Sequence, residues 1–278
     1  MWNVLKMDFY RMVHMKSFYV MLAVVMATFI FSAYVVKVAE KEIAQVTASS
    51  ELNAGEAGAP VGSGVGISIS NNGMDIHNAD IKDWYSMMSQ SRTLLLFVCI
   101  FGVLFVTSEQ NSGFIKNTVT QVSGRYELIL SKLVVMASFV IISSIVTIIG
   151  IMISQQIFYN GIKVGNLASL LSYVSVSMLI QLAASSLIIL LTTLLKSTAF
   201  SMLLAVCISM NLFSIVIDFA DSMIGTTKLA DYSLINAFSR LPLNYEQSSF
   251  LKIIMTCVVY LCAYAGLSMF VFHKQDIR

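Results

Sequence analysis

The chain has 278 residues, of which 57% are hydrophobic and only 12% are charged, with a mean hydropathy of +0.80. Soluble domains carry about 25% charged residues, so this composition excludes an ordinary soluble domain and a disordered chain. The counts of 14 Gly, 2 Pro and 4 Cys exclude a collagen-like protein and a disulfide scaffold. An all-α polytopic membrane protein remains, and the net charge of +2 gives no indication of nucleic-acid binding.

Six apolar segments are candidates to cross a bilayer, which takes about 20 residues. The second is the shortest, and we expect Trp84 and Tyr85 to extend it as an interfacial anchor while Arg92 reaches outward to water. The predicted spans cover about 17–36, 88–107, 133–158, 167–195, 198–217 and 253–272.

Lysine and arginine residues predict the orientation of these spans. Six crossings place the N-terminus, the 108–132 loop, Lys196 and the C-terminal tail on one side, where nine basic residues face four acidic ones. The longer segments on the opposite side hold eight basic and eleven acidic residues. The positive-inside rule therefore predicts that both termini are cytoplasmic.

Residues 1–16 are predicted to form an amphipathic helix in the cytoplasmic interface. Its apolar residues follow the i, i+4, i+7, i+8 spacing of one helical face: Leu5, Phe9, Met12 and Val13. The alternative is that these residues simply begin the first span. The interfacial helix is favoured because four charged residues cannot all be buried at low cost: Lys6, Asp8, Arg11 and Lys16.

The largest predicted external segment is the insert 37–87. We expect Lys37–Glu42 to continue the first helix outward, and a glycine-rich flexible loop to follow it. Asn72-Gly73 lies between two runs of alternating apolar residues, which predicts a small β-hairpin near 65–77. The external loop 218–252 mixes aspartates with apolar residues and favours short interfacial or re-entrant helices, with an ordinary folded loop as the alternative.

The cytoplasmic loop 108–132 contains the most informative polar pattern. It reads Glu109-x-x-x-Gly113-x-Ile115-Lys116-Asn117, then Ser123-Gly124-Arg125, with Lys132 opening the next span. From the residues alone, a short surface helix and a solvated loop are equally good descriptions. Together with Leu5-Lys6-x-Asp8-x-Tyr10-Arg11 and Lys16-Ser17, however, the pattern resembles the membrane (permease) subunit of an ABC-2 type ABC transporter.

This resemblance implies roles for both segments. Residues 1–16 would be the elbow helix, with Leu5, Lys6, Phe9, Arg11 and Lys16 as its characteristic positions. Glu109–Gln121 would be a coupling helix that docks into a separate cytoplasmic ATPase subunit, and Glu109 would contact Arg125 or the elbow. The implied coupling residues are Glu109, Asn111, Gly113, Ile115, Lys116, Asn117 and Arg125.

The resemblance also implies partners. A second permease subunit, identical or not, would complete the membrane part, and ATP and Mg would be bound by the ATPase partner rather than by this chain. The sequence is consistent with ATP binding by a partner, because this chain has no G-x-x-x-x-G-K-[ST] phosphate loop. No catalytic constellation and no zinc-ligand spacing among the three histidines occur either, so we expect no enzyme activity and no metal site in the isolated chain.

Polar residues inside the predicted spans have two interpretations. They are Ser143 and Thr147 in the third span, Gln181 and Ser185 in the fourth and Asn211 in the fifth. Packing between helices is the favoured interpretation, and a lining for a substrate path is the alternative. The scarcity of intramembrane charges argues against a proton- or sodium-coupled carrier.

The sequence therefore predicts the permease subunit of an ATP-driven exporter in a bacterial plasma membrane. An uncharged lining favours an amphipathic or hydrophobic substrate, and the resemblance suggests a peptide, bacteriocin or drug. An ion-extruding ABC permease, a membrane sensor or scaffold that transports nothing, and a secondary carrier are the alternatives.

Overall fold

The computed structural model describes residues 2–52, 79–111, 126–159, 161–195, 197–224, 233–234, 236–238, 241 and 247–274. None of these residues belongs to a β-strand. The hairpin predicted at 65–77 lies outside the described residues. The main helices are α1 (Trp2–His14), α2 (Lys16–Leu52), α3 (Ile81–Gln90), α4 (Thr93–Asn111), α6 (Tyr126–Tyr159), α7 (Leu167–Leu195), α8 (Thr198–Ser209), α9 (Leu212–Ile224) and α11 (Gln247–Lys274).

Five of these helices are long and apolar enough to cross a membrane. They are α2, α4, α6, α7 and α11, and the bent pair α8–α9 makes a sixth crossing if the two helices are counted together. The prediction of an all-α polytopic membrane protein is thereby confirmed. Helix α2 also runs beyond its apolar part to Leu52, in line with the expected outward continuation of the first span.

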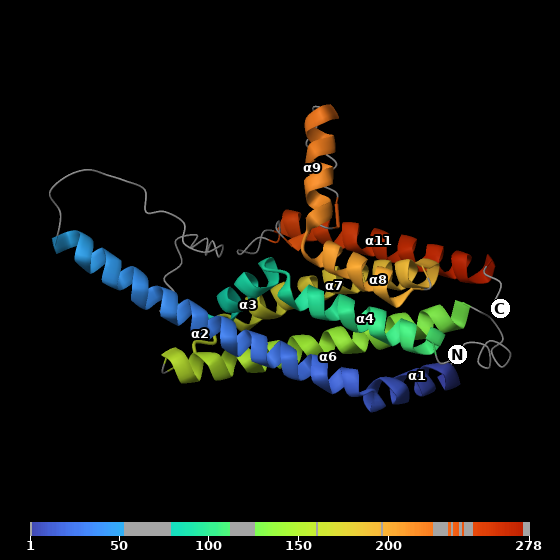
Figure 1. Ribbon diagram of the computed structural model, residues 1–278, viewed down its shortest axis with the longest axis horizontal. Helices are drawn as coiled ribbons and strands as arrows, with labels where there is room; N and C mark the ends of the chain where they lie inside the picture. The colour runs from blue at the N-terminus through green and yellow to red at the C-terminus, as the bar shows by residue number, and fades with distance from the viewer. Residues whose placement is uncertain are drawn as a thin grey trace.

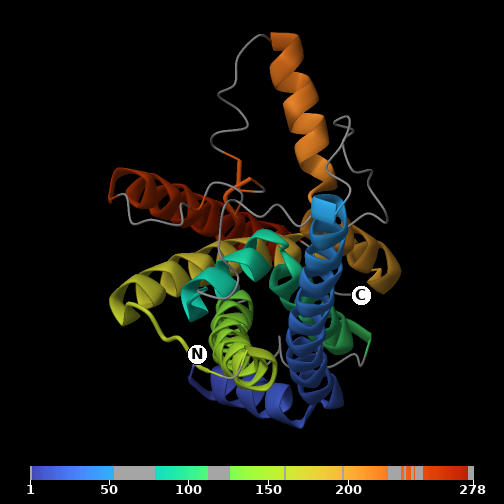
Figure 2. The ribbon, with the colours of Figure 1, turned by 90° about the vertical axis from the view of Figure 1, so that its left-hand side faces the viewer.

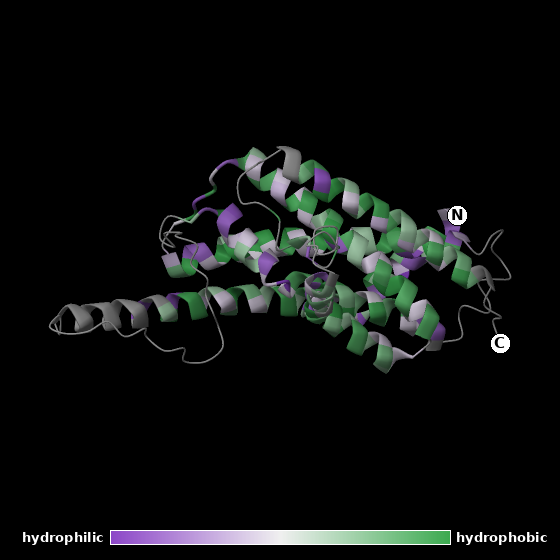
Figure 3. Ribbon diagram, turned by 90° about the horizontal axis from the view of Figure 1, so that it is seen from above, coloured by the Kyte–Doolittle hydropathy of each residue, from purple (hydrophilic) through white to green (hydrophobic). Residues whose placement is uncertain are grey.

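The long helices lie along one axis and form an elongated bundle, in which hydrophobic residues dominate (Figures 1 and 3). Helices α2 and α6 pack together, as do α7 and α11, and α4 packs on α7 and α8. Helix α1 crosses one end of the bundle (Figures 1 and 2), and the C-terminal end of α11 lies at this same end. A chain that crosses the membrane an even number of times would have its first and last helices end on the same side in this way.

Helix α6 has an exposed apolar face and a buried face of small and polar residues, the opposite of a helix on the surface of a soluble protein. One face carries four exposed isoleucines: Ile141, Ile145, Ile149 and Ile153. The opposite face is buried and carries small or polar residues: Ser143, Thr147, Gly150 and Ser154. Close approach between membrane helices favours small residues at the contact, and branched apolar residues suit a face toward lipid.

The second predicted span differs from the structure at its outer end. Trp84 and Tyr85 do not extend α4; they belong to the separate helix α3 and are buried. The prediction that Arg92 reaches water is wrong, because this residue is only 6% exposed. Its φ of 58° breaks the helix between α3 and α4 and turns α3 back onto α6 and α7. There the Tyr85 hydroxyl lies 3.0 Å from the Ser177 hydroxyl.

The fifth predicted span, 198–217, is broken in the structure. Helices α8 and α9 meet at an angle of 65°, and Asn211 between them has φ 62°. Asparagine tolerates this left-handed conformation better than other non-glycine residues, because its short side chain bonds locally. The 12 residues of α8 cover about 18 Å, which is less than the hydrocarbon core, so α8 cannot complete a crossing without α9.

Gly165 fixes the loop between α6 and α7 against the start of α3. It has φ +62°, and a Cβ atom added there would lie 2.2 Å from the carboxylate oxygen of Asp80. The neighbouring Lys163 carbonyl accepts a hydrogen bond from the Ile81 amide at 3.0 Å. We therefore expect Gly165→Ala to lower the thermal midpoint of the purified protein, whereas Gly161→Ala, which has nothing within 4 Å, leaves it unchanged. Equal midpoints for both variants would contradict this packing.

Candidate coupling site

Four charged side chains meet where α1, α4 and α6 come together. Asp8 and Arg11 lie on α1, Glu109 lies near the end of α4 and Lys132 lies in the second turn of α6. Three of these side chains are almost fully buried, with exposed fractions of 1% for Asp8, 1% for Glu109 and 2% for Lys132, and Arg11 is 22% exposed. Two acidic and two basic groups balance, so this charge cluster is formally neutral.

The contacts within the charge cluster connect all three helices. Lys132 forms an ion pair with Glu109, and Arg11 Nη1 lies 3.6 Å from Glu109 Oε1. The same guanidinium nitrogen is 3.9 Å from Asp8 Oδ1. The Ser131 hydroxyl on α6 donates a hydrogen bond to the second carboxylate oxygen of Asp8. Glu109 is therefore the central acceptor, held from both α1 and α6.

Arg11 also binds the backbone of α4. Its Nη2 donates to the Phe105 carbonyl at 2.9 Å, and its guanidinium lies 4.7 Å from the centre of the Phe105 ring. Burial lowers the pKa of Arg11, and the Asp8 carboxylate opposes this effect. Since an arginine side chain stays protonated in proteins, the guanidinium keeps its charge across the physiological pH range.

The charge cluster determines which face of α1 turns inward. The buried residues are Val4, Asp8 and Met12, which are spaced at i, i+4 and i+8. The predicted apolar face is only partly buried: Leu5 and Val13 are intermediate, and Phe9 is 39% exposed. Lys6 and Lys16 are exposed. Helix α1 is rotated from the predicted orientation because Asp8 has a partner on α6, Ser131, and Arg11 binds α4.

The structure describes the two predicted coupling residues at the end of α4, Glu109 and Asn111, but not those that follow this helix. Glu109 is in the charge cluster and contacts Arg11 on α1, so one of the two expected contacts is present, whereas Arg125 lies outside the described residues. Asn111 is the last residue of α4. The other predicted coupling residues lie outside the described residues: Gly113, Ile115, Lys116, Asn117 and Arg125.

Three residues of the site were not among the predicted site residues: Asp8, Ser131 and Lys132. Asp8 and Lys132 stand in the pattern that carries the family resemblance, but no role was predicted for them. A signal for them was present, because only 12% of the chain is charged and a charge next to an apolar span is therefore unusual. Asp8 also stands three residues before Arg11, a spacing at which opposite charges meet on a helix. What the sequence does not reveal is which charges on different helices pair.

Four of the five polar residues predicted inside the spans are buried within the bundle: Ser143, Thr147, Gln181 and Ser185. The hydroxyls of Ser143, Thr147 and Ser185 donate to carbonyls of their own helices, at 3.0, 2.9 and 2.7 Å. Gln181 lies beside the Tyr85 hydroxyl, and Asn211 lies at the break between α8 and α9. A substrate path along these residues stays a prediction. Among the described residues, no three His, Cys, Asp or Glu side chains gather as a metal site would require.

Comparison with protein families provides the decisive observation. A family model described as ABC-2 family transporter protein matches residues 58–212, which is more than half of the chain. The chain belongs to the ABC-2 transporter family. The matched range contains α3, α4, α6, α7 and α8 as well as the whole 108–132 loop, so this ABC-2 permease has Glu109 and Lys132 inside the family region. No curated protein matches the chain.

Proposed function

We propose that this ABC-2 permease is the membrane subunit of an ATP-driven exporter in a bacterial plasma membrane. Both termini and the 108–132 loop would face the cytoplasm, where a separate ATPase subunit docks on that loop. ATP and Mg would be bound by the ATPase subunit, and a second permease subunit would complete the transporter. Residues 1–16 would serve as the elbow helix.

The charge cluster is the observation that carries this proposal. The 108–132 loop that would receive the ATPase starts in the last turn of α4 and ends in the second turn of α6, and the charge cluster connects these two helices to each other and to α1. In a site with little water, such ion pairs are stronger than at a protein surface. A displacement of the loop would therefore move the ends of three helices together, as rigid-body coupling requires.

The proposed substrate is amphipathic or hydrophobic, such as a peptide, a bacteriocin or a drug. The support is the interior of the bundle, where most buried side chains are apolar or carry hydroxyl groups that donate to their own helices, and few are charged. A strongly charged substrate would find few ion partners there. An ion-extruding permease of the same family is the alternative proposal.

Transport in membrane vesicles tests the function. Inside-out vesicles that contain the chain and its ATPase partner are expected to accumulate an amphipathic fluorescent dye or peptide only with ATP, and vanadate should stop the accumulation. Accumulation without ATP would instead indicate a secondary carrier. Movement of sodium without the dye would indicate an ion permease, and ATPase stimulation without any movement would indicate a sensor.

Deletion of Gly55–His77 tests the proposed orientation. This segment belongs to the insert expected on the external side, away from the cytoplasmic partner, so the shortened chain should still assemble with the ATPase subunit at wild-type stoichiometry. Co-purification through a tag on the permease measures this assembly. Loss of the ATPase from the shortened but inserted chain would contradict the topology.

A further inference from the structure

The side of α1 that points away from the bundle carries positive charge. This outer face consists of the exposed residues of the helix: Trp2, Asn3, Lys6, Phe9, Tyr10 and His14. Lys6 and Asp8 stand two residues apart, a spacing that places them on nearly opposite sides of a helix. Asp8 is the only acid of α1 and is buried in the charge cluster, at the edge of the bundle where α1 lies (Figure 2). The outer face therefore presents Lys6 without a carboxylate of the same helix.

Aromatic residues accompany Lys6 on the outer face. Trp2 is 74% exposed and Tyr10 is 66% exposed. The Tyr10 ring stacks on the imidazole of His14, with ring centroids 3.8 Å apart, so the helix itself supports both rings. Aromatic rings of this kind settle at the level of lipid headgroups, and lysines beside them suit a negatively charged surface. The composition of the outer face is therefore that of a helix that lies on a membrane.

The place of α1 in the fold puts the outer face at the depth of lipid headgroups. The part of α2 that can cross a membrane begins at Lys16, and only Met15 separates it from α1. On its inner side, α1 binds the last turns of α4 through Arg11 and the second turn of α6 through Asp8. Both α4 and α6 are spans that have an end here. Helix α1 therefore lies at the boundary of the bilayer, and the exposed Lys16 adds a second cation next to its outer face.

We propose that the outer face of α1 binds anionic phospholipid headgroups, with Lys6 and Lys16 as the cations that hold their phosphates. Neither lysine has an ion-pair partner among the described residues. An anionic membrane surface favours each nearby lysine by a factor of about five, whereas a neutral lipid surface does not. The aromatic rings favour lipid over an acidic protein as the occupant. The outer face would bind lipid whichever substrate the transporter moves, so this site goes beyond the proposed function.

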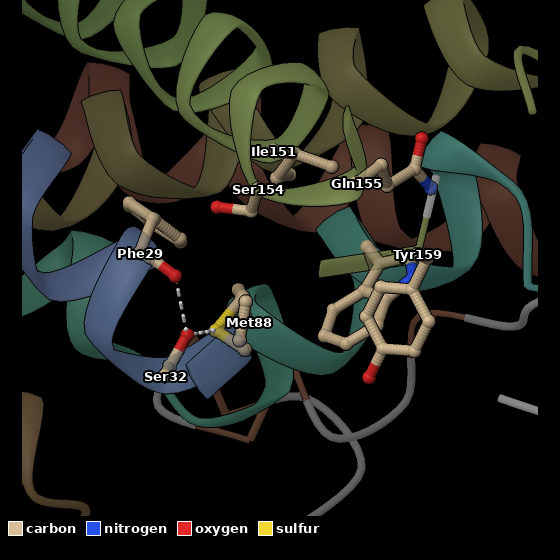
Figure 4. A pocket seen from close by; sticks show the side chains of 9 residues that line it. Phe29, Ser32, Met88, Ile151, Ser154, Gln155 and Tyr159 are labelled. Carbon is tan, nitrogen blue, oxygen red and sulfur yellow. Dashed lines mark hydrogen bonds between the residues drawn. The ribbon is translucent and has the colours of Figure 1, made fainter. Parts of the chain in front are cut away.

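The two tryptophans of the chain differ in a way that makes Trp2 a reporter for the outer face. Trp84 is only 4% exposed and lines a small pocket between α2, α3 and α6. Phe29, Met88 and Tyr159 close around this pocket, which has room for about one water molecule (Figure 4). Trp84 therefore contacts protein, whereas the exposed Trp2 can contact lipid.

Fluorescence quenching by brominated lipids tests the site. The purified full-length chain, without an ATPase subunit, is placed in nanodiscs of equal parts phosphatidylglycerol and phosphatidylcholine, and the acyl chains of one lipid or the other carry bromine. The Trp2 signal is the difference between the unmodified chain and Trp2→Phe in the same discs. We expect Trp2 to prefer phosphatidylglycerol by about fivefold or more, and Lys6→Gln/Lys16→Gln to reduce this preference to about one.

Lys41→Gln/Lys252→Gln is the matched control. Both lysines are exposed and lie toward the opposite end of the bundle, so this double variant should keep the preference of the unmodified chain. The proposal is overturned if both brominated lipids quench Trp2 equally in the unmodified chain, or if the two double variants respond alike. An outer face that shows no lipid preference, but loses a co-purified ATPase subunit in Lys6→Gln/Lys16→Gln, belongs to that protein instead.

Discussion

Replacing Glu109 by leucine is expected to destabilise the folded permease by about 3–5 kcal/mol, because Lys132 would remain buried without its carboxylate partner. Leucine is similar in size to glutamate, so the loss of stability would come from the missing charge rather than from a cavity. Only Asp8 would then face the two cations Arg11 and Lys132. The midpoint of thermal unfolding of the purified protein in detergent measures the effect, and the amount of monodisperse protein after extraction gives a second readout.

The double variant Glu109→Leu/Lys132→Met provides the internal control. It removes both members of the buried pair, leaves Asp8 with Arg11, and should recover most of the stability that either single variant loses. Asp218→Asn removes an exposed carboxylate on α9 and should change little. A double variant that is no more stable than either single one would show that the two charges do not act as a pair.

The second large effect is expected for Gly113→Trp. If the 108–132 loop docks into a groove on the ATPase subunit, an indole at position 113 of this loop should block the fit and reduce ATP-driven transport at least tenfold without lowering the amount of inserted permease. ATP-dependent dye accumulation in vesicles, normalised to permease content, measures the change. Gly113 lies outside the predicted spans, so extraction and thermal midpoint should stay unchanged.

Gly161→Trp is the matched control. Gly161 lies in the loop at the opposite end of the bundle, and a Cβ atom added there would meet nothing within 4 Å. The same substitution at this position should therefore leave transport intact. If Gly113→Trp also transports at the unmodified rate, the assignment of the 108–132 loop to coupling is refuted.

The sequence predicts the helical class of this protein because hydropathy alone decides it. A segment such as 133–158, which is mostly apolar and has no charged residue, has no alternative to a helix in a bilayer, where every backbone group must be satisfied within the segment. The breaks at Arg92 and Asn211 were not predicted. Neither position is glycine or proline, and a left-handed backbone at other residues leaves no signature in hydropathy.

The charge cluster shows a second limit of prediction from sequence. Glu109 was singled out through the family pattern, and Arg11 through its place on α1, but the pairing of Lys132 with Glu109 depends on how three helices pack. The burial of Asp8 was also unexpected, since a lone carboxylate is costly to bury. Its partners Ser131 and Arg11 offset that cost, and only the tertiary structure brings Ser131 close.

Co-purification from native membranes tests the central claim most directly. The tagged permease is extracted in mild detergent, its partners are identified by mass spectrometry, and vanadate-sensitive ATPase activity is measured on the purified sample. The proposed function predicts a stoichiometric ATPase subunit that carries a phosphate-binding loop, retained by the Gly161→Trp chain and lost from the Gly113→Trp chain. A permease that purifies without any ATPase, or one that keeps its ATPase in the Gly113→Trp chain, would contradict it.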